Sequence, residues 1–256
     1  FPGTFLALKN KITYLKKLGV TTIELMPVYE FEEMMIPPVS KLPDYIQWNP
    51  KEEDQILPSD EPQADPKVNY WGYGNGLYFA PKSAYCATRD PHREFCDMIR
   101  AFHKAGIGCI MEMYFPRECN PVTALRALQF WKLYYHVDGF HVLGEGVSAK
   151  LLMHDGVLSD TRLMFHDFDE SQIRKKKKPE DKCIAQYNPG FLQDMRRFLK
   201  SDEDMVSAAA YHIRRNPNTY AVINYMACQD GFTMNDMVTY RSEEHTSELQ
   251  SHEPIS

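Results

Sequence analysis

Histidines and cysteines are the side chains of this sequence best suited to proton transfer or metal binding. His166 could donate a proton near neutral pH. Together with His141 it supplies at most two metal ligands, fewer than a zinc site needs. The cysteines form no C-x-x-C pair and show no matching histidine spacing; they are Cys86, Cys96, Cys109, Cys119, Cys183 and Cys228. We therefore expect no metal, no other cofactor and no disulfide framework, and a reducing, cytoplasmic setting.

Phosphate and nucleic-acid chemistry find little support in the sequence. Gly72, Gly74 and Gly76 are not followed by Lys-Ser/Thr, and no helix is expected to begin there. The basic run 174–178 has no interleaved aromatic residue, which favours an exposed loop over a nucleic-acid contact. The net charge is −6 and the pI about 5.9, so broad attraction to nucleic acid or anionic lipid is not expected. The sequence contains no apolar run of about 18 residues, so no membrane span is predicted.

The elements that must position any site alternate between strand and helix. The chain has 256 residues, 43% of them hydrophobic and 25% charged, enough for one large barrel or two small domains. A helical stripe of about fifteen residues opens it at Phe5. Six later segments read as strands: 20–28, 107–115, 137–143, 162–168, 184–188 and 220–227. Helices are predicted between them over 90–105, 122–135, 149–158 and 191–199. This alternation predicts βαβ units and a parallel sheet.

Two segments do not fit the alternation. Residues 34–67 hold seven prolines among polar residues and are predicted to be an irregular insertion. Residues 241–256 resemble the translation of a sequencing adapter and are excluded from fold reasoning, with a natural acidic tail as the alternative.

Four segments carry motifs that point to a known family. They are Gly3 to Pro27 with Glu24-Leu25-Met26-Pro27; Asn69-Tyr70-Trp71-Gly72-Tyr73 with Phe79-Ala80-Pro81; Val137-Asp138-Gly139-Phe140; and the segment from Asn224 to Asp236. In order and spacing they resemble glycoside hydrolase family 13, within it the isoamylase and glycogen-debranching branch of the α-amylase superfamily. The resemblance implies an α/β fold, a (β/α)8 TIM barrel of α-amylase type, formed by residues 1–240 as an incomplete barrel. The family's first and eighth strands are expected to lie outside this sequence.

The positions that the resemblance assigns to catalysis are substituted. Family members use a carboxylate nucleophile and a carboxylic general acid. Here Leu143 stands at the nucleophile position and His166 at the general-acid position. Two supporting positions hold His141 and Gln229, and only Asp230, the transition-state stabiliser, is retained.

The strand-three motif of the family is also altered. Glu112 replaces its aspartate, and Pro116 and Arg117 stand where active members have Asn-His. Because the proline side chain has no ligand atom, the calcium that some members bind near that asparagine is not expected here.

Neighbouring acids are not expected to replace the lost groups. On an extended strand Glu145 would share the face of Leu143 but lie about 6.6 Å further along. Asp167 and Asp169 lie one and three positions from His166, so on an extended strand they point to the opposite face. Tyr70, Trp71 and Tyr73 remain, and their amphipathic rings suit the faces of glucose, although packing within a loop explains Trp71 and Tyr73 equally well.

The sequence therefore predicts a debranching-type protein of α-glucan metabolism that is catalytically inactive as written. It would act by binding glycogen or starch-like glucan or by pairing with an active paralogue. Two alternatives stay open: an active α-1,6-glucan debranching hydrolase with non-standard residues, and an unrelated role on the same scaffold. Neither nucleic acid nor membrane is expected as a partner.

Overall fold

A parallel sheet of six strands forms the centre of the protein. The structure is a computed structural model, and it describes residues 2–35, 67–173 and 182–229. The strands follow the order β1-β6-β7-β8-β9-β10, and every neighbouring pair is parallel. Their bounds are β1 (Thr22–Leu25), β6 (Gly108–Tyr114), β7 (Gly139–Leu143), β8 (Arg162–Phe165), β9 (Ile184–Tyr187) and β10 (Ala221–Ile223). The six predicted strands and their parallel arrangement are confirmed.

The sheet is curled rather than flat. The Tyr187 hydroxyl on β9 donates a hydrogen bond to Glu24 on β1, although these strands are separated by β6, β7 and β8. In a flat sheet, four strand spacings of about 4.8 Å would hold them about 19 Å apart. The strands therefore wrap around an inner face, as they do in part of a (β/α)8 barrel.

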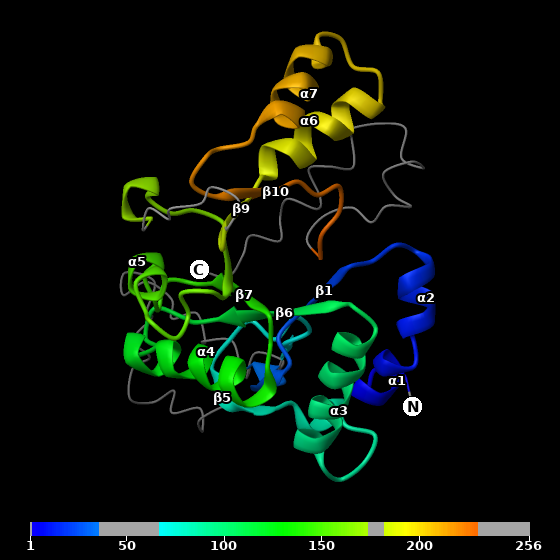
Figure 1. Cartoon of the computed structure of the whole chain (residues 1–256), viewed down its shortest axis with the longest axis vertical. Coiled ribbons are helices and arrows are strands. Elements are labelled where there is room, and N and C mark those ends of the chain that lie inside the picture. The colour runs from blue at the N-terminus through cyan, green and yellow to red at the C-terminus, as the bar shows by residue number, and fades with distance from the viewer. Residues whose placement is uncertain (1, 36–66, 174–181, 230–256) are drawn as a thin grey trace, which may run out of the picture.

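Helices cover the outer side of this curled sheet (Figure 1). In that view α3 and α4 lie below β6 and β7, while α6 and α7 lie beyond β9 and β10. The helices are α1 (Phe5–Lys9), α2 (Ile12–Lys17), α3 (Pro91–Lys104), α4 (Pro121–Tyr135), α5 (Ala149–Met153), α6 (Pro189–Leu199) and α7 (Met205–Arg214). Asp90, Asn120 and Asn188 cap α3, α4 and α6, each followed by proline at the first helical position, as expected for helix starts. None of the helices in the described ranges has the length and hydropathy needed to span a bilayer.

Short antiparallel strands follow β1 and carry the loop with the Asn69-to-Tyr73 motif. β2 (Tyr29–Phe31) pairs with β5 (Gly76–Pro81), and β3 (Met34–Met35) pairs with β4 (Lys67–Val68). Two short 3-10 helices, η3 (Ser83–Tyr85) and η4 (Glu170–Gln172), complete the described elements. The sequence did not predict these antiparallel pairs, because two of their strands have only two residues each. Most of the predicted insertion, the basic run and the 241–256 tail lie outside the described residues.

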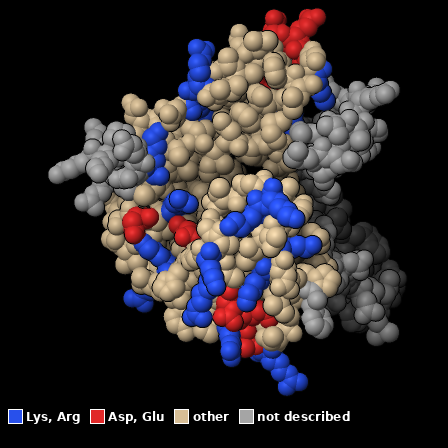
Figure 2. Space-filling view, turned by 45° about the vertical axis from the view of Figure 1, so that its right-hand side comes forward, with Lys and Arg blue, Asp and Glu red and all other residues tan. Residues whose placement is uncertain are grey.

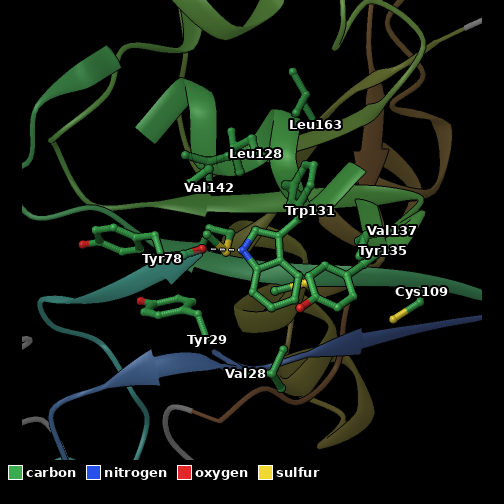
Figure 3. Close-up of a cluster of buried hydrophobic side chains, with 14 of the residues drawn as sticks. Val28, Tyr29, Tyr78, Cys109, Leu128, Trp131, Tyr135, Val137, Val142 and Leu163 are labelled. Carbon is green, nitrogen blue, oxygen red and sulfur yellow. Dashed lines mark hydrogen bonds between the residues drawn. The ribbon is translucent and has the colours of Figure 1, made fainter. Parts of the chain in front are cut away.

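The core lies between β6, β7 and the helices α3 and α4, and aromatic rings fill much of it (Figure 3). Trp131 of α4 is fully buried, and its indole N–H donates to the Tyr78 carbonyl oxygen at 2.6 Å. Its ring stacks on Tyr135 with centroids 4.5 Å apart. This hydrogen bond ties α4 to β5, and so ties the outer helical layer to the antiparallel pair that holds the aromatic loop.

Two helix predictions need correction, and one helix was not predicted. The opening stripe forms α1 and α2 rather than one helix, and the first helix ends at its C-cap Asn10, a residue type that disfavours helix interiors. The helix expected over 149–158 ends at Met153, because the Asp155 carboxylate accepts the N–H groups of Val157 and Leu158 and stabilises a turn. Helix α7 was not predicted, although three consecutive alanines favour it.

Candidate functional site

The predicted catalytic positions lie together at one end of the inner face of the sheet. His141 and Leu143 are two residues apart on β7 and therefore share a face. In the register, Glu112 of β6 pairs with His141, and Tyr114 pairs with Leu143. On the other side Met164 of β8 pairs with His141, and His166 follows two residues later. The parallel strands thus bring these residues to their carboxyl ends, where barrels of this kind hold their sites.

The centre of the site is a histidine between two glutamates. His141 Nδ1 lies 2.6 Å from Glu24 Oε1 and 3.9 Å from Glu112 Oε1. The side chains of His141 and Glu112 are 4% and 6% exposed, and that of Glu24 is 29% exposed. The site is therefore largely shielded from water, and its charges interact more strongly than surface charges do.

Two tyrosines hold the outer oxygens of these glutamates. The Tyr73 hydroxyl donates to Glu112 Oε2 at 2.6 Å, and the Tyr187 hydroxyl donates to Glu24 Oε2. Gln229 Nε2 in turn donates to the Tyr73 oxygen at 2.7 Å. Burial raises the pKa of both phenols, so both keep their protons and act as donors. The two carboxylates are thereby fixed in orientation.

Aromatic rings cover the side of the site next to β8 and β9. The rings of His141 and Tyr187 stack with centroids 4.2 Å apart and an interplanar angle of 15°. His166 lies 5.0 Å from the His141 ring and 5.5 Å from the Tyr187 ring. The predicted general-acid position thus holds an imidazole packed in a stack of rings.

The environment separates the pKa values of the two glutamates. Burial raises the pKa of Glu112 to about 7, and the nearby charge of Glu24 adds to this, although the Tyr73 hydrogen bond and His141 oppose it. Burial would also raise the pKa of Glu24, but its bonds to His141 and Tyr187 outweigh burial and bring that pKa below its ordinary value. Burial, with the charge of His141, lowers the pKa of His166. At neutral pH the site therefore favours an ionised Glu24 and a neutral His166.

The structure changes the reason why Glu145 cannot replace a nucleophile at position 143. The strand ends at Leu143, and Gly144 adopts a φ of +81°, so Glu145 does not continue an extended strand as the sequence argument assumed. The Glu145 carboxylate instead accepts a hydrogen bond from Arg117 Nε at 2.8 Å, and both side chains are exposed. Glu145 is therefore turned away into an exposed ion pair.

The other candidate acids are engaged locally or lie outside the described residues. Asp167 accepts the Phe168 N–H, and Asp169 accepts the Ser171 N–H at the start of η4. Asp230 lies outside the described residues, while its neighbour Gln229 reaches Tyr73. Among the described residues, the site contains no carboxylate at the predicted nucleophile or general-acid position.

The three aromatic residues of the 69–73 motif do not act as one group. Tyr70 and Trp71 are 77% and 42% exposed, and their rings pack edge to face at 5.0 Å. Gly72 separates them from Tyr73: its φ is +79°, and a side chain there would meet Phe31 at 2.7 Å. Tyr73 consequently points into the buried site, whereas Tyr70 and Trp71 face outward.

Sequence reasoning did not place two residues of this site. Glu24 was noted only as part of a strand motif, and Tyr187 only as part of a strand. The signal for Glu24 was an acid in a short strand that holds no other charged residue, since an ionised side chain on a strand of a barrel interior usually has a partner. No comparable signal existed for Tyr187, because tyrosine is common in strands.

No protein-family model matches the chain. The chain is, however, similar to curated proteins. It is 25% identical over 312 residues to "Isoamylase 3, chloroplastic" of Oryza sativa subsp. japonica, and the match covers 93% of this chain and 37% of that protein. It is 26% identical over 309 residues to "Glycogen debranching enzyme" of Serratia proteamaculans, and the match covers 93% of this chain and 43% of that protein. The chain thus spans about two fifths of the length of these relatives. They confirm the resemblance to the isoamylase and glycogen-debranching branch.

Solved structures confirm the fold. Pullulanase type I from Bacillus subtilis, complexed with maltose, superposes with a TM-score of 0.61 at 17% identity, covering 98% of this chain and 43% of that one. Pullulanase from Paenibacillus barengoltzii, complexed with maltohexaose and α-cyclodextrin, superposes with a TM-score of 0.58 at 15% identity. The match covers 92% of this chain and 46% of that one. The curled parallel sheet is part of a TIM barrel of the kind found in these proteins.

Proposed function

Because this chain is homologous to isoamylases and glycogen debranching enzymes, we propose that it is an α-glucan-binding protein of the debranching type that does not hydrolyse glucan. One observation carries the proposal. At the carboxyl ends of β7 and β8 the two positions assigned to the catalytic carboxyl groups hold Leu143 and His166, and the ring of His166 packs against His141 and Tyr187.

The remaining acids do not offer a substitute pair. Retaining hydrolysis needs a nucleophile and an acid about 5–5.5 Å apart, both open to the sugar. Glu24 and Glu112 each have one oxygen held by a tyrosine hydroxyl and the other directed at His141. Glu145 is engaged by Arg117. Leucine cannot attack an anomeric carbon, and a neutral imidazole without a nucleophile has nothing to assist.

Glucan binding is supported by the exposed pair Tyr70 and Trp71. Amphipathic aromatic rings suit sugar faces, which are partly apolar and partly hydroxylated. The face shown in Figure 2 carries interspersed basic and acidic side chains without one continuous region of either sign, which favours an uncharged polymer over a polyanion. The proposal includes two further parts: pairing with an active paralogue, and a cytoplasmic location, with which the absence of disulfides among the cysteines of the described residues agrees.

The test measures reducing ends released from glycogen and retention of the protein in a glycogen-containing gel. We expect no release and clear retardation. Trp71→Ala should weaken retardation, whereas Tyr211→Ala, which removes a more exposed aromatic residue from α7, should not.

Three outcomes would contradict parts of the proposal. Release of reducing ends that is abolished by Glu24→Gln or Glu112→Gln would show hydrolysis by a rearranged acid pair. Absence of retardation in a folded sample would remove glucan binding and favour an unrelated scaffold role. Equal retardation of both aromatic variants would place the glucan elsewhere on the surface.

A further inference from the structure

Glu24, Glu112 and His141 bring three potential metal ligands together on the inner face of the sheet. They come from β1, β6 and β7, which are consecutive in the sheet. One ligand atom from each side chain lies within 4.8 Å of the other two. The sequence could not show this group, because the residues are separated by 88 and 29 positions along the chain.

The orientation of each carboxylate leaves one oxygen directed at the centre of the group. Tyr187 binds Glu24 Oε2, and Oε1 faces His141 Nδ1. Tyr73 binds Glu112 Oε2, and Oε1 faces the same nitrogen. Hydrogen bonds of this kind, made to the outer atoms of ligands, orient the ligands of metal sites.

Burial and charge favour a cation at this point. His141 and Glu112 are nearly inaccessible, so water does little to screen the two carboxylates from each other. A single imidazole offsets one negative charge at most, and only in its protonated form. A bound divalent cation would offset both carboxylates while leaving the imidazole neutral, which is the form that ligates metals.

We propose that Glu24, Glu112 and His141 bind a divalent transition-metal ion of the zinc class through two carboxylate oxygens and one imidazole nitrogen. Zinc accepts carboxylate oxygens and imidazole nitrogens as ligands, and sites with three protein ligands leave a fourth position for water. Tetrahedral zinc, with ligand bonds of about 2.0–2.1 Å, holds its ligand atoms about 3.3 Å apart. Glu24 Oε1, now 2.6 Å from Nδ1, must move outward by less than an ångström, and Glu112 Oε1, at 3.9 Å, must move inward.

The ion would join β1, β6 and β7 across the inner face. This site does not depend on glucan binding, and the failure of one proposal leaves the other standing. The competing interpretation is that the group is a self-sufficient ion pair of protonated His141 with Glu24. The two interpretations differ in whether the protein retains a metal.

Equilibrium dialysis of the chelator-treated whole chain against zinc chloride, with metal analysis of both compartments, tests the proposal. We expect about one tightly held ion per chain. Glu112→Gln, which keeps size and removes a charged ligand, should lower zinc affinity at least tenfold. Tyr73→Phe removes only an orienting hydrogen bond and should lower affinity about 10- to 100-fold. Circular dichroism establishes that each variant is folded.

Two controls separate this site from others in the chain. His103→Ala removes a histidine of another His–Asp pair, His103 with Asp138, and should leave zinc binding unchanged. Cobalt(II) in place of zinc reports the ligand type, because thiolate ligands add an intense near-ultraviolet absorption that oxygen and nitrogen ligands lack. Wild-type protein that retains no zinc, zinc retained equally by Glu112→Gln, or a thiolate band with cobalt would each overturn the proposal.

Discussion

His141 stands where the resemblance places an arginine, and this exchange changes the chemistry of the site. A guanidinium stays protonated at all accessible pH values and can bind a carboxylate with two N–H groups. An imidazole is smaller and contacts Glu24 through one nitrogen. The buried acid pair is therefore contacted by a single ring nitrogen rather than by a fork of two N–H groups.

The raised pKa of Glu112 predicts a loss of stability as the pH rises. Folding raises this pKa from 4.5 to about 7, so the folded state binds the proton more tightly than the unfolded chain does. The resulting stabilisation is complete below pH 4.5 and is lost as the pH rises through about 7. The lowered pKa of Glu24 acts in the opposite direction, but only as the pH falls below 4.5.

Urea unfolding in the presence of a chelator measures this effect. From about pH 5 to about pH 7.5 the wild-type protein should lose stability relative to Glu112→Gln, which cannot titrate. Glu118→Gln, at an exposed glutamate near the end of the same strand, is the control and should follow the wild type. A constant difference between wild type and Glu112→Gln across this range would contradict the prediction.

At the scale of the elements, the turn after β7 decides which side chains reach the site. Gly144 ends the strand in a left-handed conformation, and a Cβ there would lie 2.2 Å from the Phe115 carbonyl oxygen. The chain after β7 therefore passes close to the end of β6. This close approach turns Glu145 outward to Arg117 and leaves position 143 without a neighbouring acid.

Gly144→Ala should consequently destabilise the protein strongly. A residue with a side chain is strained at this φ, and the contact with Phe115 adds to the strain, so we expect a loss of at least about 2 kcal/mol in the free energy of unfolding. Gly156→Ala is the matched control, because a Cβ there meets no atom within 4 Å. It should change stability by less than about 0.5 kcal/mol. Equal effects in thermal or urea unfolding would show that the turn is not constrained.

At the scale of the whole molecule, hydrogen bonds across the curled sheet join distant parts of the chain. Tyr187 and Glu24 are 163 positions apart, and Gln229 and Tyr73 are 156 apart. Within the described residues β1 and β10 are the two edges of the sheet, each paired with one neighbour. The contact from Tyr187 to Glu24 therefore stabilises the curvature that shapes the inner face.

Tyr187→Phe tests this contribution without changing ring packing. Removal of a hydrogen bond to a carboxylate costs about 1.5–3 kcal/mol when the group is buried, and because Glu24 is partly exposed we expect about 1–2 kcal/mol. Tyr211→Phe, on the exposed side of α7, should be neutral. If both substitutions leave the urea midpoint unchanged, the cross-sheet hydrogen bond contributes nothing to stability.

Local patterns in the sequence were enough to predict the sheet. Apolar runs separated by capped helices, as at Asp90 and Asn120, predicted six parallel strands, and their motifs placed Leu143 and His166 at the substituted positions. These features could be predicted because strand and helix periodicities, caps and motifs act within a few residues. Even so, the sequence predicted one opening helix, whereas the structure has two helices separated at Asn10.

The composition of the site depended on the tertiary structure. Glu24, Glu112, His141 and Tyr187 meet only because parallel pairing sets the register of their strands and the sheet curls enough for β9 to reach β1. The outward turn of Glu145 likewise depends on the close packing of two strand ends at Gly144. Such contacts join residues far apart in the chain, and neither strand periodicity nor residue type specifies the curvature and side-chain directions that produce them.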